Sequence, residues 1–152
     1  MKKLPEAHTV AYWKTSHVDP GSWIEKASEQ IQKAGGQVLG HMFGTEYALG
    51  RAAYLLDFTV EGERFKVVWP VLPSKREDEL AARRQAATLL FHDVKARCLS
   101  ARVLGLRRAF FSYMLLSDGR AAADHVEEEL IRVLPAFPGT PSAKLLPESK
   151  EC

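Results

Sequence analysis

Two runs that carry aromatic and branched aliphatic side chains at alternate positions flank the dipeptide Glu61-Gly62, and they restrict the fold more than any other feature of this sequence. The runs cover Arg51–Val60 and Glu63–Trp69. A short glycine-containing loop between two such runs is typical of a β-hairpin. If Glu61 and Gly62 form the loop, Val60 opposes Glu63, and the other pairs follow because side chains alternate between the faces of a strand.

The predicted register gives the hairpin one apolar, aromatic face and one mixed, basic face. On the apolar face Phe58 lies opposite Phe65, and Leu56 opposite Val67. On the other face Asp57 meets Lys66, which is a favourable cross-strand pair, and Thr59 meets Arg64. The aromatic residues at alternate positions are most simply interpreted as the sheet face that a helix buries: Tyr54, Phe58, Phe65 and Trp69.

Patterns on either side of the hairpin predict an α+β fold with an N-terminal helix, a three-stranded antiparallel sheet, a long basic helix and further C-terminal helices. Ser22 and Glu25 have the spacing of a capping box, which predicts a helix that begins near Trp23. Residues 8–18 are expected to form either a short edge strand or an ordered arm. The other predicted elements are helices over Trp23–Lys33, Glu77–Leu104, Leu106–Leu116 and Ala121–Leu134, and a first strand over Val38–Gly44.

The length of 152 residues suits one domain, which we place at residues 1–134, followed by a Pro-rich flexible tail over residues 135–152.

The first residues lack the apolar run of a signal peptide, and no stretch is apolar enough to span a bilayer. Cys98 and Cys152 have no metal-ligand spacing, which favours a reducing, cytoplasmic location. The absence of asparagine favours a source that lives at high temperature.

Positive charge is concentrated in the long predicted helix and just after it, although the net charge of the chain is only +2. Between residues 83 and 108, seven basic residues accompany one acidic residue, Asp93. At helical steps Arg84, Lys95 and Arg102 share a narrow arc, and Arg83 and Arg97 lie on the other flank of the apolar stripe. Such a line of cations can follow a phosphate backbone. The alternative is a solvated helix whose arginine stems cover the edge of the core.

Aromatic residues interleave with basic ones in three segments, a pattern that suits the stacking of unpaired bases. The segments are Tyr12–Lys14, Arg64–Trp69 and Arg107–Tyr113. Phe110 and Phe111 are adjacent and cannot both point inward from a helix, so at least one is expected to contact a ligand or another subunit. Trp13 is a further candidate because a short arm offers it little core.

No catalytic or metal-binding set is evident, so the chain is not expected to be an enzyme or to need a cofactor. No histidine has a second ligand at metal-binding spacing, and the glycines form no phosphate-binding loop. The histidines are His8, His17, His41, His92 and His125. An enzyme whose site residues are dispersed along the sequence is the weakest alternative.

Four stretches resemble a family of small phage and prophage proteins: Gly50–Phe58, Gly62–Pro73, Lys95–Arg97 and Phe110–Arg120. The shared pattern is a hairpin that closes in Pro-x-x-Pro, a basic helix, and a leucine-rich turn that ends in Asp-Gly. The resemblance covers about residues 15–125 and implies a role in phage DNA metabolism, including single-stranded-DNA binding outside the common barrel fold. The order of helix, three strands and helix is also similar in outline to the double-stranded-RNA-binding domain, whose lysine signature is missing here.

The sequence therefore predicts a sequence-tolerant single-stranded-DNA-binding protein, with a homo-oligomer as an open alternative. The basic sheet face and the basic side of the helix would form the binding groove if they are adjacent. A competing hypothesis is a phage protein that binds and inhibits a host protein through its exposed aromatic side chains. The predicted phosphate contacts are Arg64, Lys66, Arg84, Lys95, Arg97, Arg102, Arg107 and Arg108, and the predicted stacking residues are Trp13, Trp69 and Phe111.

Overall fold

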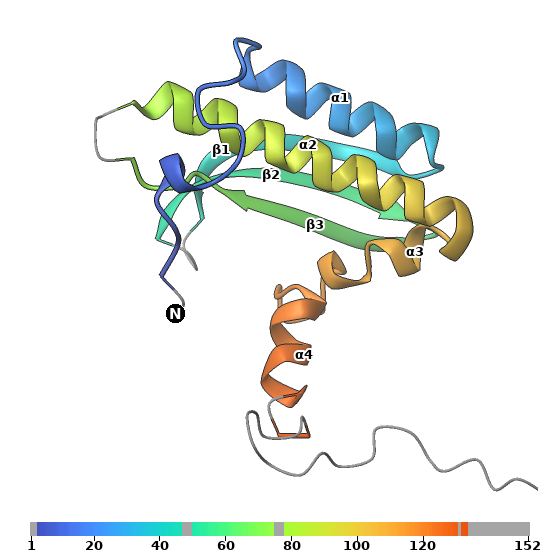
Figure 1. Ribbon diagram of the computed structural model, residues 1–152. Helices are drawn as coiled ribbons and strands as arrows, with labels where there is room; N and C mark the ends of the chain where they lie inside the picture. The colour runs from blue at the N-terminus through green and yellow to red at the C-terminus, as the bar shows by residue number, and fades with distance from the viewer. Residues whose placement is uncertain (1–2, 47–49, 75–77, 131, 134–152) are drawn as a thin grey trace, which may run out of the picture.

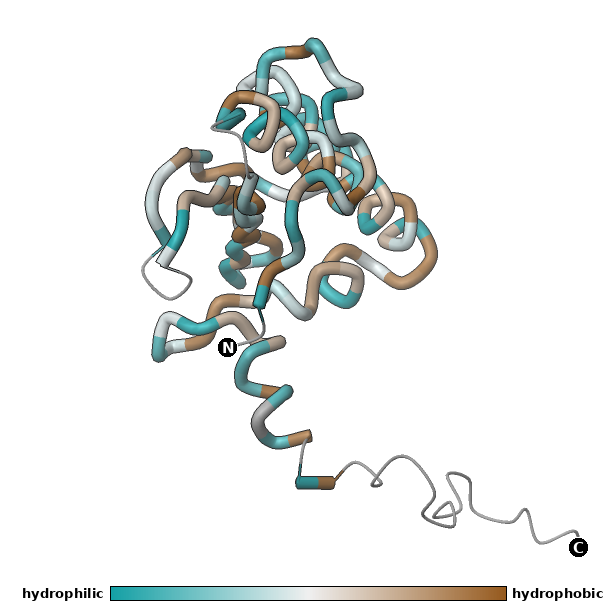
Figure 2. The backbone as a smooth tube through the Cα atoms, turned by 60° about the vertical axis from the view of Figure 1, so that its left-hand side comes forward, coloured by the Kyte–Doolittle hydropathy of each residue, from teal (hydrophilic) through white to brown (hydrophobic). Residues whose placement is uncertain are grey.

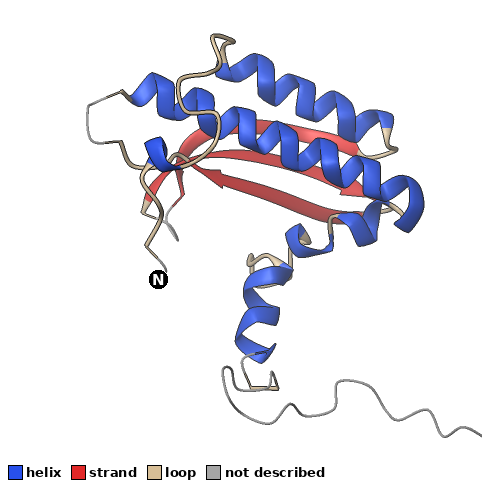
Figure 3. Ribbon diagram, in the orientation of Figure 1, coloured by secondary structure: helices blue, strands red, loops and turns tan. Residues whose placement is uncertain are grey.

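The computed structural model describes residues 3–46, 50–74, 78–130 and 132–133. Its strands form one antiparallel sheet in the order β1-β2-β3, and helices α1 and α2 lie side by side on one face of that sheet (Figures 1 and 3). The predicted α+β fold is confirmed. In chain order the elements are η1 (Ala7–Thr9), α1 (Pro20–Lys33), β1 (Gln37–Glu46), β2 (Arg51–Val60), β3 (Glu63–Pro70), α2 (Glu79–Leu104), α3 (Leu106–Ala109), η2 (Phe111–Tyr113) and α4 (Ala122–Leu130).

The hairpin register derived from the loop is confirmed along the whole β2–β3 pair. Val60 pairs with Glu63, Phe58 with Phe65, and Asp57 with Lys66. The loop residues Glu61 and Gly62 both have positive φ, at 51° and 83°. Two left-handed residues give the turn a twist that matches the right-handed twist of the strands, which fixes the register.

The hydrophobic core lies between the sheet and the two helices. Phe58 and Phe65 are fully buried and stack with their ring centroids 5.3 Å apart. Leu90 and Val94 of α2 and Ile31 of α1 are also fully buried in this cluster. The aromatic sheet face is therefore covered by helices, as its alternating pattern predicted.

The N-terminal residues before α1 form an ordered arm, and the alternative of an edge strand is wrong. The arm makes a turn of 3-10 helix at η1 and then crosses towards α2. Ala7 N–H donates to the Pro73 carbonyl over 2.8 Å, and the Gln85 amide of α2 donates to carbonyls of Ala7, Val10 and Ala11. Because Gln85 satisfies the arm's carbonyls, the arm does not need a strand partner.

Helix α1 begins at Pro20, and the capping-box prediction is wrong. Ser22 lies inside the helix, and the N-cap residue Asp19 makes no side-chain capping hydrogen bond. Proline suits the first helical position because its φ is already helical and its missing N–H would have no partner there. Helix α2 begins at Glu79, and the predicted first residue, Glu77, lies outside the described residues.

The predicted helix over Leu106–Leu116 is wrong after Ala109. The chain continues as the short η2, and Leu115 N–H then donates to the Arg64 carbonyl over 2.8 Å. Met114 forms a bridge with Phe65. This segment lies along the outer edge of β3, so its backbone groups bond to the sheet and not to a helix.

Helix α4 is shorter than predicted and stands apart from α1 and α2 in both views (Figures 1 and 2). Residues 131 and 134 of the predicted last helix, and the predicted tail over residues 135–152, lie outside the described residues. Among the helices that the structure describes, none is long and apolar enough to cross a membrane.

Candidate nucleic-acid interface

A groove of about 780 Å³ runs between α1 and α2. It contains three basic side chains, Lys33 from α1 and Lys95 and Arg102 from α2, and no acidic residue is among those that line it in the described part of the chain. None of the three basic side chains forms an ion pair with a described residue. The groove therefore holds uncompensated positive charge.

Helical spacing places these cations together. Lys95 and Arg102 are seven positions apart, which is close to two turns, so they lie on the same side of α2. Helices α1 and α2 run in the same direction (Figure 1), so the last turn of α1, with Lys33, lies near Arg102. Of the three residues predicted to share one arc, Lys95 and Arg102 both line the groove, whereas Arg84 does not.

A cluster of aromatic rings lies where the arm meets the two helices. The Tyr12 ring stacks on His92 with centroids 4.8 Å apart and an interplanar angle of 14°. Trp23 of α1 contacts Phe91 of α2 with centroids 5.0 Å apart. His92 also lines the groove, so the aromatic cluster borders the groove at this residue.

Two lysines extend the positive charge over this aromatic cluster. Lys26 Nζ lies 4.8 Å from the centre of the Trp23 ring, and Lys95 Nζ lies 5.9 Å from that of Phe91. Trp23 Nε1 donates to Ser16 Oγ over 3.1 Å, which holds the indole in place. Stacked rings beside flexible cations are the combination that binds unpaired bases and their phosphates.

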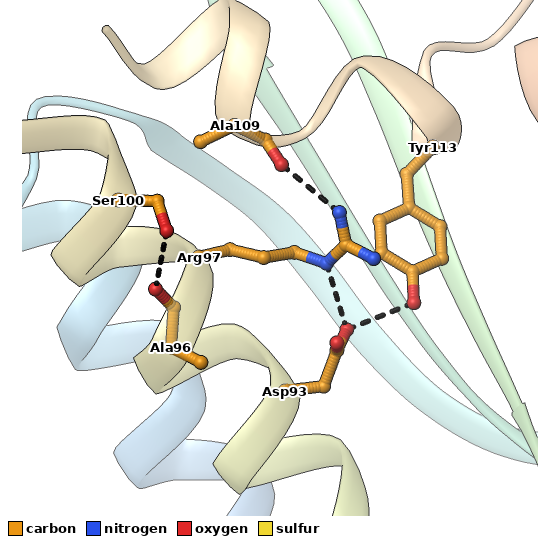
Figure 4. A network of polar contacts seen from close by, with 6 residues as sticks. All are labelled: Asp93, Ala96, Arg97, Ser100, Ala109 and Tyr113. Atoms are coloured by element: carbon orange, nitrogen blue, oxygen red, sulfur yellow. Dashed lines mark hydrogen bonds and ion pairs between the residues drawn. The ribbon is translucent and has the colours of Figure 1, made fainter. Parts of the chain in front are cut away.

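Arg97, a predicted phosphate contact, is instead engaged inside the protein (Figure 4). Its Nε donates to Asp93 over 3.0 Å, its Nη1 donates to the Ala109 carbonyl over 2.9 Å, and its guanidinium lies 4.6 Å from the centre of the Tyr113 ring. These contacts tie α2 to the segment that follows it. Arg97 therefore has a structural role, and it does not line the groove.

The same network makes stability sensitive to high pH. The pKa of Tyr113 is held well above its usual value, mainly by burial and then by the nearby Asp93 carboxylate, to which the Tyr113 hydroxyl donates a hydrogen bond over 2.8 Å. Because the folded pKa is the higher one, this contribution to stability is complete below the unfolded pKa of about 10 and is lost as the pH rises beyond it. We expect urea unfolding to show falling stability above about pH 10. A Tyr113→Phe variant that kept the full alkaline loss would contradict this cause.

The basic sheet face does not join the groove. Helix α2 packs on the opposite, aromatic face, so Arg64 and Lys66 point away from it. Both are also paired with acids, since Arg64 Nε donates to Asp57 over 3.0 Å and Lys66 Nζ lies 3.7 Å from Glu46. The basic sheet face and the basic side of α2 are therefore not adjacent, so the condition for a shared groove is not met, because both the apolar stripe of α2 and the aromatic side of the hairpin turn towards the core.

The remaining predicted cations are scattered. Arg84 is half-buried, with its Nε shielded from solvent. Arg107 is bound to Glu63 at 2.6 Å, and Arg108 is exposed on α3. Arg83, on the other flank of α2, lies over the Phe43 ring and donates to the Tyr54 hydroxyl. None of these four lines the groove.

Of the predicted stacking residues, only Phe111 is well exposed. Phe110 is fully buried and Phe111 is 48% exposed, which confirms that the two rings point in different directions. Trp13 and Trp69 are half-buried against the core. In the arm it is Tyr12, not Trp13, that presents its ring to solvent.

Several residues of the groove and of the aromatic cluster beside it were not predicted from the sequence. On α1 the residues Trp23, Lys26, Gln30 and Lys33 recur at helical spacing, and this pattern was the available signal. Tyr12 and His92 are 80 positions apart in the chain, and only the fold brings them together.

Comparison of the chain with models of protein families, with curated proteins and with solved structures found no match. The described residues also contain no group of histidine, cysteine and acidic side chains that could hold a metal ion.

Proposed function

We propose that this chain binds single-stranded nucleic acid, with single-stranded DNA as the expected ligand, in the groove between α1 and α2. The observation that carries the proposal is a groove with three unpaired cations, no acidic lining residue in the described part of the chain, and stacked rings at one end. Cations that replace condensed counterions along a phosphate backbone provide affinity without sequence preference. Aromatic faces add affinity for bases that are not already stacked in a duplex.

The proposal also includes the biological process and the cellular compartment in which the protein acts. The resemblance to small phage proteins supports a role in phage DNA metabolism in the host cytoplasm. Cys98 is a free, buried thiol, and burial raises its pKa to about 11, which suits a packing role in a reducing compartment.

The test is binding of a fluorescent thymidine oligonucleotide across a salt series. In a Lys95→Gln/Arg102→Gln variant we expect affinity to fall by about tenfold at low salt, because two phosphate contacts and the counterions that they release are lost. The slope of log K against log salt should become shallower by about 1.4, because each phosphate contact of a single strand contributes about 0.7.

The matched control is an Arg64→Gln/Lys66→Gln variant, which removes one arginine and one lysine from the opposite side of the sheet. Its affinity and salt slope should stay close to those of the unmodified protein. Equal losses in the two variants would show that only general positive charge matters, and no loss in the groove variant would rule out the groove as the binding site.

A second candidate function is binding of a protein partner, and the exposed apolar residues at the end of α2 favour it. Leu99, Val103 and Leu104 are 66%, 86% and 51% exposed, and Phe111 is also exposed. Recovery of one stoichiometric protein partner, lost in a Val103→Asp variant, together with no binding of oligonucleotides, would favour this function over the first.

A further inference from the structure

The arm holds Tyr12 in a strained backbone conformation. Tyr12 has φ of 66° and Lys14 has φ of 55°, in the left-handed region that bulky residues rarely occupy. Strain of this kind persists only where the surrounding contacts enforce it, and it is common at ligand-binding sites.

The contacts that enforce this conformation come from both sides of Tyr12. Before it, the Gln85 amide donates to the carbonyls of Val10 and Ala11, over 3.1 Å and 3.0 Å. After it, Lys14 Nζ pairs with Asp78 at 2.9 Å. The arm is therefore anchored to α2 and to the residue just before it, and Tyr12 is held over the helix.

The result is a flat pair of rings at the border of the groove. Tyr12 lies nearly parallel to His92, yet it remains 40% exposed. His92 covers one face of the Tyr12 ring, so the exposed surface of the ring is its other face and its edge. His92, on which Tyr12 stacks, lines the groove together with Lys95, which lies about one helical turn further along α2.

We propose that the Tyr12–His92 pair is a stacking platform for an unpaired nucleobase, and that it gives the groove its preference for single strands. This inference rests on the proposed function. The cations bind the phosphates of any nucleic acid, whereas a base can stack on Tyr12 only if its own face is free. In a duplex the base faces are covered by neighbouring base pairs, so the platform adds affinity only for single strands.

The experiment compares Tyr12→Leu, which keeps apolar bulk but removes the ring, with Tyr12→Phe, which keeps the ring. Each is measured with a thymidine oligonucleotide and with a duplex. For Tyr12→Leu we expect about tenfold weaker binding of the single strand, unchanged binding of the duplex and an unchanged salt slope. Tyr12→Phe should bind like the unmodified protein.

The outcomes separate this inference from the function on which it rests. If Tyr12→Leu binds the single strand normally while Lys95→Gln/Arg102→Gln binds it weakly, the groove is correct and the platform is wrong. If neither variant loses affinity, the proposed function has failed. Equal losses for single strand and duplex in Tyr12→Leu would mean that Tyr12 only positions the arm, which overturns the platform. Competition by free thymidine monophosphate as effective as by the oligonucleotide would overturn it too, because the site would then be a nucleotide pocket.

Discussion

Replacing Phe110 with alanine is expected to lower the free energy of unfolding by about 3–5 kcal/mol, the range for loss of a buried phenylalanine ring. Phe110 is fully buried and meets Phe58 edge-to-face, with centroids 5.1 Å apart and an interplanar angle of 79°. Phe58 in turn stacks on Phe65. The Phe110 ring thus anchors the segment after α2 to the sheet, and its loss leaves a cavity between them.

The neighbouring residue provides a matched control. Phe111 carries the same side chain but is 48% exposed, so Phe111→Ala should change stability by less than about 1 kcal/mol. Urea unfolding of both variants, followed by tryptophan fluorescence, measures the difference. Similar destabilisation by the two substitutions would contradict the assignment of Phe110 to the core and Phe111 to the surface.

Replacing Gln85 with alanine is expected to destabilise the protein by about 2–3 kcal/mol, because its amide has several buried partners. Gln85 is 1% exposed, and its Nε2 donates to the carbonyls of Ala7, Val10 and Ala11 over 2.8 to 3.1 Å. Without the amide, these carbonyls lose their donor and the arm loses its main attachment to α2. A Gln85→Glu change should be worse, since a carboxylate facing three carbonyls is repelled by them.

Hydrogen exchange of the arm is the most direct measurement, because loss of the Gln85 amide should release residues 7–11 before the rest of the fold opens. Unfolding in urea then gives the global effect. Gln32→Ala is the control, since Gln32 is exposed on α1 and its loss should cost less than about 0.5 kcal/mol. Equal exchange from the arm in the two variants would show that Gln85 does not hold it.

Gln85 and Phe110 are expected to affect nucleic-acid binding in different ways. If Gln85 holds the arm, then its substitution should also weaken binding of single strands, because Tyr12 would no longer be fixed over His92. The Phe110 substitution acts on the other end of α2 and should affect binding only through global unfolding.

Among the candidate site residues, the sequence predicted those that share one helix. Lys95 and Arg102 could be assigned to one surface because helical spacing is a local property. Helical spacing could not predict that Arg97 is engaged in contacts within the protein. It lies on α2 like the others, but its partners Ala109 and Tyr113 come from the segment after α2, which was expected to be one helix and instead leaves the helix after Ala109 and turns along β3.

The sequence by itself determined the hairpin: its loop, its register and the separation of an aromatic face from a basic one. These follow from neighbouring residues, because a short left-handed turn and a two-residue period leave one register that buries Phe58 and Phe65 together. Only the tertiary structure decided which surface carries the groove. Packing of α1 and α2 on the aromatic face separates the cations of the sheet from those of the helix. Burial of the core also places the Tyr12 ring on His92, and it places His92 and Lys33, which are far apart in sequence, in the lining of one groove.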